Sequence, residues 1–137
     1  MPEPITIILA GEPHGKGRPR FTRAGHAYTD AKTRRYEDVL RLAAQSEMGA
    51  RPPLDGPVSV QVEARMPVPV SWSRKKQAAA LAGEVAPTSK PDIDNIIKSL
   101  DALNQVVFRD DRQIVHAVVR KLYHQAPALI IRISEAA

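Results

Sequence analysis

The chain has no cysteine, few aromatic residues and no long apolar run. Without cysteine it cannot form disulfide bonds, thiolate nucleophiles, iron–sulfur clusters or zinc sites of the cysteine type. Its aromatic residues are two phenylalanines, one tryptophan and three tyrosines, so aliphatic side chains must fill the core. The apolar run near the N-terminus is Ile5–Ala10, and no basic segment precedes it. Neither a signal peptide nor a membrane span is therefore expected.

Length, proline content and charge narrow the class of protein further. A chain of 137 residues indicates one domain with its own hydrophobic core. Twelve prolines interrupt it often, which argues against a bundle made only of helices. Twenty lysines and arginines against 15 aspartates and glutamates give a formal net charge of +5. This favours a polyanionic partner such as nucleic acid, although other basic proteins share the property.

The pattern of apolar residues predicts one mixed α+β domain over residues 1–137. Apolar, β-branched or alternating segments predict four strands, at residues 5–9, 58–64, 114–122 and 129–133. Capping residues and helical spacing predict three helices, from 29 or 30 to 48, from 74 to 81, and from 92–94 to about 107. The expected apolar faces are Val39, Leu40, Leu42 and Ala43 in the first helix, and Ile96, Ile97, Leu100, Leu103 and Val107 in the third. With a loop at 11–28, the order is β-α-β-α-α-β-β, a mixed β-sheet with flanking helices.

Two acidic stretches, residues 90–98 and 108–112, contain the candidate metal ligands. On a regular helix Asp92 and Asp94 would point about 200° apart. Pro91 favours a helix that begins just after it, and in an extended or capping conformation the two carboxylates lie on the same side. Both would then lie beside the positive end of the helix. The spacing is therefore compatible with one shared metal ion.

Hard divalent cations such as Mg²⁺ prefer carboxylate oxygens. Asp92 and Asp94 are therefore candidate ligands, with Asp111 as the third. Lys98 follows Asp94 by one helical turn and would stabilise an attacking water or phosphate oxygens electrostatically. Such a site could hydrolyse a phosphodiester. The alternative is that these aspartates are ordinary helix caps and turn residues.

A basic arm precedes the first long helix. Its cationic residues are Lys16, Arg18, Arg20, Arg23, Lys32, Arg34 and Arg35. Phe21 and Tyr28 lie between them, and Asp30 is the only acidic residue of the stretch. Such a segment can contact phosphates and stack on exposed bases. The alternative is a solvated loop with no ligand.

Several motifs resemble those of the RusA family of crossover-junction endodeoxyribonucleases, along nearly the whole chain. They are Gly-Lys-Gly-Arg-Pro-Arg-Phe (15–21) with Tyr28-Thr29, Ser-Trp-Ser-Arg-Lys-Lys (71–76), Pro-Thr-Ser-Lys-Pro-Asp-Ile-Asp-Asn (87–95) with Lys98, Asp-Ala-Leu-Asn (101–104), and Asp-Asp-Arg-Gln-Ile (110–114). The resemblance implies a RusA-like nuclease domain. By position, the family's catalytic, metal-binding aspartates correspond to Asp92, Asp94 and Asp111, and its essential lysine to Lys98.

The resemblance also implies a cofactor and partners. These are Mg²⁺, for which Mn²⁺ is expected to substitute, and a homodimer that resolves four-way DNA junctions by paired symmetric nicks in recombination and repair. The expected DNA-binding residues are Lys16, Arg18, Arg20, Arg23, Arg34, Arg35 and Lys90. A cytoplasmic protein of bacterial or prophage origin is expected. The alternatives are a nuclease for other branched DNA such as flaps, or a non-catalytic DNA-binding protein of the same fold.

The chain departs from the family pattern at one position. Only Ser99 and Leu100 separate Lys98 from Asp101, where the family usually has three residues. One deleted residue turns the rest of a regular helix by about 100°. Asp101 is therefore a doubtful site residue on sequence grounds.

Overall fold

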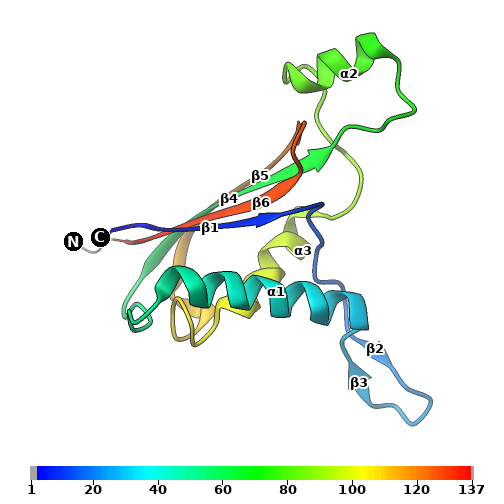
Figure 1. The fold of residues 1–137 in the computed structure, drawn as a ribbon. Coiled ribbons are helices and arrows are strands. Elements are labelled where there is room, and N and C mark those ends of the chain that lie inside the picture. The colour runs from blue at the N-terminus through cyan, green and yellow to red at the C-terminus, as the bar shows by residue number, and fades with distance from the viewer. Residues whose placement is uncertain (1–2, 137) are drawn as a thin grey trace.

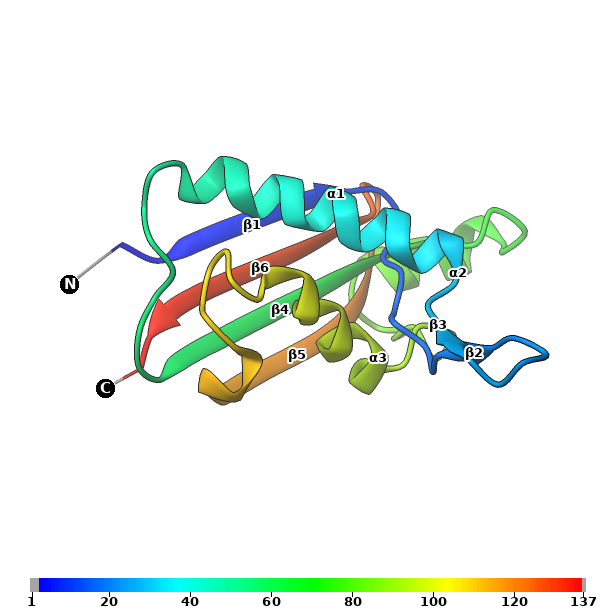
Figure 2. The ribbon, with the colours of Figure 1, turned by 90° about the horizontal axis from the view of Figure 1, so that it is seen from below.

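The computed structural model describes residues 3–136, which are built around one four-stranded sheet. Its strands lie in the order β1 (Ile5–Ala10), β6 (Ala128–Glu135), β4 (Val58–Pro67) and β5 (Ile114–His124). One face is covered by α1 (Ala31–Met48), α3 (Ile93–Lys98) and the 3₁₀ helix η1 (Ser99–Leu103), as Figure 2 shows. The helix α2 (Arg74–Leu81) and a hairpin of β2 (Arg20–Phe21) and β3 (Ala27–Tyr28) project away from the sheet (Figure 1). The expected mixed α+β fold is confirmed, and the hairpin is an addition within the expected loop.

The sheet combines both strand directions. β6 pairs antiparallel with β1 on one side and with β4 on the other, whereas β5 runs parallel to β4. Every second side chain of β4 is buried, beginning with Val58, because these side chains face the helices. A parallel pair needs a crossover connection. Here the crossover is residues 68–113, which contain α2, α3, η1 and the 3₁₀ helix η2 (Asp111–Gln113).

The boundaries of α1 follow its capping residue, but its buried face differs from the prediction. The Asp30 carboxylate accepts a hydrogen bond from the Thr33 backbone N–H at 3.1 Å. Leu40, Ala44 and Met48 are buried, four residues apart and therefore in one stripe against the sheet. Two of the expected core residues are exposed, Val39 by 50% and Leu42 by 63%, because they lie beside and behind that stripe.

The third predicted helix is wrong in its length. α3 ends at Lys98, and the chain tightens into η1 from Ser99 to Leu103. The buried Ser99 hydroxyl donates to the Ile96 carbonyl at 2.5 Å, within this tighter turn. The apolar residues expected on one side of a single helix are nevertheless all buried or packed against the core: Ile96, Ile97, Leu100, Leu103 and Val107. None of the described helices combines the length and the hydropathy that a membrane-spanning helix requires.

The corrected face of α1 can be tested with two leucines of the same helix. Leu40→Ala should lower the free energy of unfolding by about 2–5 kcal/mol, because it removes a fully buried side chain. Leu42→Ala is the matched control and should change it by no more than about 0.5 kcal/mol, because this side chain is mostly exposed. Urea denaturation measures both. Equal losses in the free energy of unfolding for the two variants would contradict the assignment of Leu40 to the buried face and Leu42 to the exposed face.

Candidate functional site

Asp92 and Asp94 lie at the beginning of α3, as the sequence predicted. Asp92 is the residue before the first helical turn, in an extended conformation with φ −70° and ψ 155°, and Asp94 lies in that first turn. Both are exposed. The Asp92 side chain makes no capping hydrogen bond to α3, so its carboxylate is not used as an ordinary cap would be. Lys98 is the last residue of α3 and is also exposed.

The adjacent aspartates at the start of η2 have different roles. The Asp110 carboxylate accepts a hydrogen bond from the Arg112 backbone N–H at 2.9 Å, and the Gln113 side chain accepts one from the Asp110 N–H at 2.9 Å. The hydrogen bond from Arg112 holds the pKa of Asp110 below its usual range. Asp110 is therefore the cap of η2. This assignment leaves the Asp111 carboxylate for another role.

Asp101 lies against Asp111, although the shortened spacing made it a doubtful site residue. A hydrogen bond with the Asp101 carboxyl, together with burial and the neighbouring Asp110, raises the pKa of Asp111 to about 6. A carboxyl beside another acid is harder to ionise, because two negative charges would repel. A divalent cation offsets the same repulsion, so this pair of oxygen donors is chemically suited to Mg²⁺ or Mn²⁺.

The structure does not bring all the predicted ligands together. Asp111, in η2, lies against Asp101 of η1. Asp92 and Asp94 lie at the other end of the α3–η1 segment. Within residues 3–136, no three histidine or acidic side chains are arranged to hold one metal ion. That Asp92, Asp94 and Asp111 share an ion therefore stays a prediction. The Asp-Ala-Leu motif was the signal for Asp101, and the assumption of a continuous α-helix obscured it.

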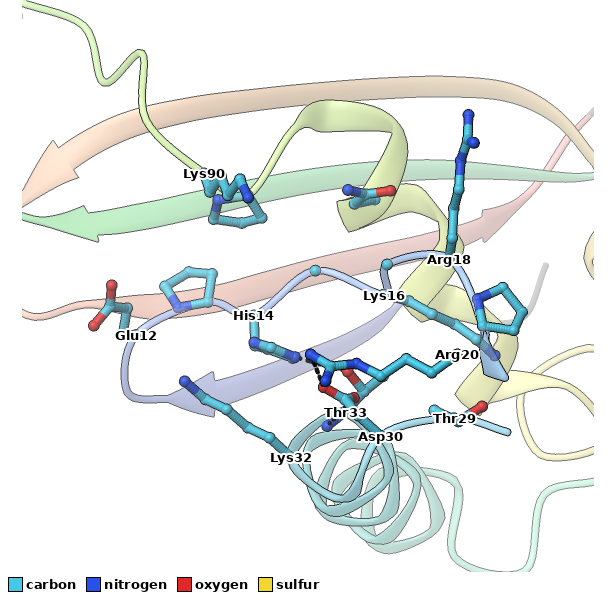
Figure 3. Close-up of a pocket in the computed structure, with 16 residues that line it drawn as sticks. Glu12, His14, Lys16, Arg18, Arg20, Thr29, Asp30, Lys32, Thr33 and Lys90 are labelled. Carbon is cyan, nitrogen blue, oxygen red and sulfur yellow. Dashed lines mark hydrogen bonds and ion pairs between the residues drawn. The ribbon is translucent and has the colours of Figure 1, made fainter. Parts of the chain in front are cut away.

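A cationic cavity of about 730 Å³ lies between the basic arm, the beginning of α1 and the segment before α3 (Figure 3). Its charged lining includes Arg18, Arg20, Lys32 and Lys90. Arg20 reaches towards Asp30, with 3.9 Å between Nη2 and Oδ2. The structure thus gathers cationic side chains from three parts of the chain: the basic arm, the first turn of α1 and the residue before Pro91.

Of the other predicted DNA-binding residues, Lys16 also lines the cavity, whereas Arg23, Arg34 and Arg35 lie outside it. Arg23 is exposed between β2 and β3, on the hairpin that carries the exposed rings of Phe21 and Tyr28. Arg34 and Arg35 are exposed on the first turns of α1. The arm therefore contains a β-hairpin, and it presents both cationic and aromatic groups to solvent.

Lys16 differs from the other cations of the arm. Its ammonium lies 3.3 Å from a carboxylate oxygen of Glu37 and 3.3 Å from one of Asp101, and its side chain is only 24% exposed. Burial alone would lower the pKa of Lys16, but the bonds to Glu37 and Asp101 outweigh it and raise the pKa. Sequence reasoning could not find this partnership, because Glu37 and Asp101 are far from Lys16 along the chain.

The proximity of Asp101 and Asp111 predicts a pH-dependent change at Asp111. In metal-free protein the Asp111 carboxyl should titrate near pH 6, so protons compete with a cation for it below that pH. Asp101→Asn should lower the pKa of Asp111 towards the ordinary range, because an amide can donate a hydrogen bond to the carboxylate. Carboxyl ¹³C NMR against pH measures both. Asp38→Asn, on the exposed side of α1, should leave the titration unchanged, and an unshifted curve in Asp101→Asn would contradict the contact.

Known proteins resemble this chain along nearly its whole length. The chain matches a family model described as "Endodeoxyribonuclease RusA" over residues 10–134, a range that includes the basic arm and both acidic stretches. It is also 38% identical over 137 aligned residues to "Uncharacterized protein YqaN" of Bacillus subtilis (strain 168), with 96% of each chain covered. The chain therefore belongs to the RusA family of endodeoxyribonucleases, hydrolases that resolve Holliday junctions.

Proposed function

We propose that this chain is a magnesium-dependent endonuclease that resolves four-way DNA junctions by paired symmetric nicks, in recombination and repair. The observation that carries the proposal is that residues 90–95 belong to both parts of the site. Lys90, Pro91 and Asn95 line the cationic cavity, and Asp92 and Asp94 lie between them in the sequence. A DNA backbone in the cavity would therefore pass beside these carboxylates.

The chain's own residues have separable roles in this proposal. Asp92, Asp94 and Asp111 would hold the ion, with Asp101 beside Asp111. A bound Mg²⁺ or Mn²⁺ supplies a water of lowered pKa and neutralises charge on the scissile phosphodiester. Lys98 stabilises the phosphate oxygens by its charge. In-line attack by water on the phosphorus of the phosphodiester would leave a 5′-phosphate and a 3′-hydroxyl.

The cationic residues would position the DNA rather than react with it. Arg18, Arg20 and Lys90 line the cavity, and Arg23, Arg34 and Arg35 extend the positive surface onto the hairpin and α1. Contacts to phosphates are independent of sequence and set orientation. A homodimer is part of the proposal, because one chain offers one acidic site and two opposed nicks need two.

Two other functions are compatible with the same site. A nuclease for flaps would share the acids and the cavity but would rank branched substrates differently. A non-catalytic DNA-binding protein would show salt-sensitive binding and no metal-dependent product. The close pair of Asp101 and Asp111 favours the enzyme, because a protein that only binds DNA gains nothing from two adjacent anions.

The central test is cleavage of a synthetic four-way junction, with matched linear duplex and flap substrates, in Mg²⁺ and in EDTA. The wild-type chain should nick opposing strands of the junction symmetrically, and only with the metal. Asp94→Asn should retain junction binding but lower the cleavage rate by more than about 100-fold, because it weakens a ligand of the ion. Asp38→Asn is the control and should cleave at the wild-type rate. An Asp94→Asn protein as fast as the control would reject the assigned role.

The cationic cavity also predicts how junction binding depends on salt concentration. Replacing both Arg18 and Arg20 by Ala should weaken junction binding and reduce the slope of log K against log salt concentration by about 1.8, because each phosphate contact contributes about 0.9. Replacing Arg51 and Arg132, neither of which lines the cavity, is the control and should leave the slope unchanged. Fluorescence anisotropy at several salt concentrations measures the slope. The same slope in both double variants would place the DNA elsewhere.

A further inference from the structure

Gly15 is in unusually close contact with the segment that begins α3. A Cβ atom at this position would lie 2.7 Å from the Pro91 Cβ and 2.8 Å from the Asn95 Cβ. Distances below about 3.0 Å require one of the atoms to shift. A Cβ built at any of the other six glycines meets no atom within 4 Å. The backbone of the basic arm is therefore packed directly on the residues that flank Asp92 and Asp94.

Lys16, the next residue, connects the arm to three elements. Its backbone N–H donates to the Asn95 carbonyl in α3 at 2.9 Å. Its ammonium lies 3.3 Å from the Asp101 carboxylate in η1 and 3.3 Å from the Glu37 carboxylate in α1. The Glu37 side chain is only 13% exposed, and Lys16 is its ion-pair partner.

These contacts join the two separate acidic groups of the site. α3 carries Asp92 and Asp94, and η1 carries Asp101 against Asp111. Gly15 and Lys16 contact both elements, and they line the same cavity as Arg18 and Arg20. The arm thus fixes the position of α3 relative to η1 while it presents cations to the cavity.

We propose that Gly15 and Lys16 are positioning residues for cleavage: they hold the first turn of α3 in place against η1, and Lys16 acts through Asn95, Asp101 and Glu37 and not as a phosphate contact. The inference rests on the proposed nuclease function and revises the assignment of Lys16 to the DNA-binding residues. Arg18 and Arg20 keep that role. Misplacement of a catalytic group by about 1 Å can cost on the order of 100-fold in rate, so such positioning has a measurable effect.

Gly15→Ala tests the packing without any change of charge. It should lower the single-turnover cleavage rate at saturating junction by about 10–100-fold, with the dissociation constant within about threefold of wild type. Amide hydrogen exchange in α3 should accelerate, because the added methyl displaces the arm from Pro91 and Asn95. Gly17→Ala is the control for exchange and should leave α3 as protected as in the wild type, since its methyl meets no atom within 4 Å.

Lys16→Met tests the ion pairs. The salt slope of junction binding should stay at the wild-type value, whereas a lost phosphate contact would reduce it by about 0.9. The cleavage rate should fall at saturating junction, and Lys16→Arg should recover part of it because the charge returns. A reduced slope with an unchanged rate would make Lys16 a DNA contact and overturn the proposal. An unchanged slope with an unchanged rate would also overturn it.

Hydrogen exchange separates this inference from the proposed function. If the wild-type chain does not cleave junctions but α3 loses protection in Gly15→Ala and not in Gly17→Ala, the nuclease proposal fails and the positioning role of the arm stands. If the wild-type chain cleaves and Gly15→Ala matches it in both rate and exchange, the nuclease proposal stands and the positioning role is rejected. Thermal melts of Lys16→Met show whether it is folded; if it is not, Gly15→Ala decides the outcome.

Discussion

The parallel pairing of β5 with β4 is the constraint on which the rest of the structure depends. Two parallel neighbours cannot be joined by a tight turn, so the chain must leave the end of β4 and return to the opposite end of the sheet before β5 begins. The return path is residues 68–113, and every candidate catalytic residue lies on it. The same path supplies the buried apolar residues of α3 and η1. The segment that makes the parallel pairing possible therefore also carries the acidic residues.

The positive and negative charges of the molecule have opposite effects on the binding of DNA. A nuclease must attract a polyanion and also keep a cluster of carboxylates that repels it. Here the arginines of the arm lie around an open cavity, whereas the candidate catalytic acids lie on the crossover, and within residues 3–136 only the ion pair of Lys16 with Asp101 joins the two groups. The pKa of Asp111, raised to about 6, lowers the negative charge of the acidic group near pH 6 and below. Protonation of Asp111 thus lessens the repulsion of DNA in that pH range.

Local features of the fold were predictable from the sequence, and contacts between distant residues were not. The cap of α1 at Asp30, the alternation in β4 and the beginning of α3 after Pro91 all follow from neighbouring residues. The buried stripe of α1 was misjudged, because the apolar residues of that helix outnumber those that contact the sheet. The link from Lys16 to Glu37 and Asp101 depends on how three elements pack, and no local pattern contains that information. The likeness to the RusA family included Asp101 in its Asp-Ala-Leu-Asn motif, whereas the assumption of a continuous α-helix obscured the contact of Asp101 with Asp111.

The tight winding of η1 has a consequence for how the family tolerates changes in length. A 3₁₀ helix rises about 2.0 Å and turns about 120° per residue, against about 1.5 Å and about 100° in an α-helix. From Ser99 to Asp101 the difference amounts to about 1.5 Å, the rise of one α-helical residue, and to about 60° of the roughly 100° by which such a residue turns. A segment that is one residue short therefore recovers the full length and more than half of the rotation by Asp101. The winding of the backbone thus absorbs most of the loss of a residue from the middle of this crossover.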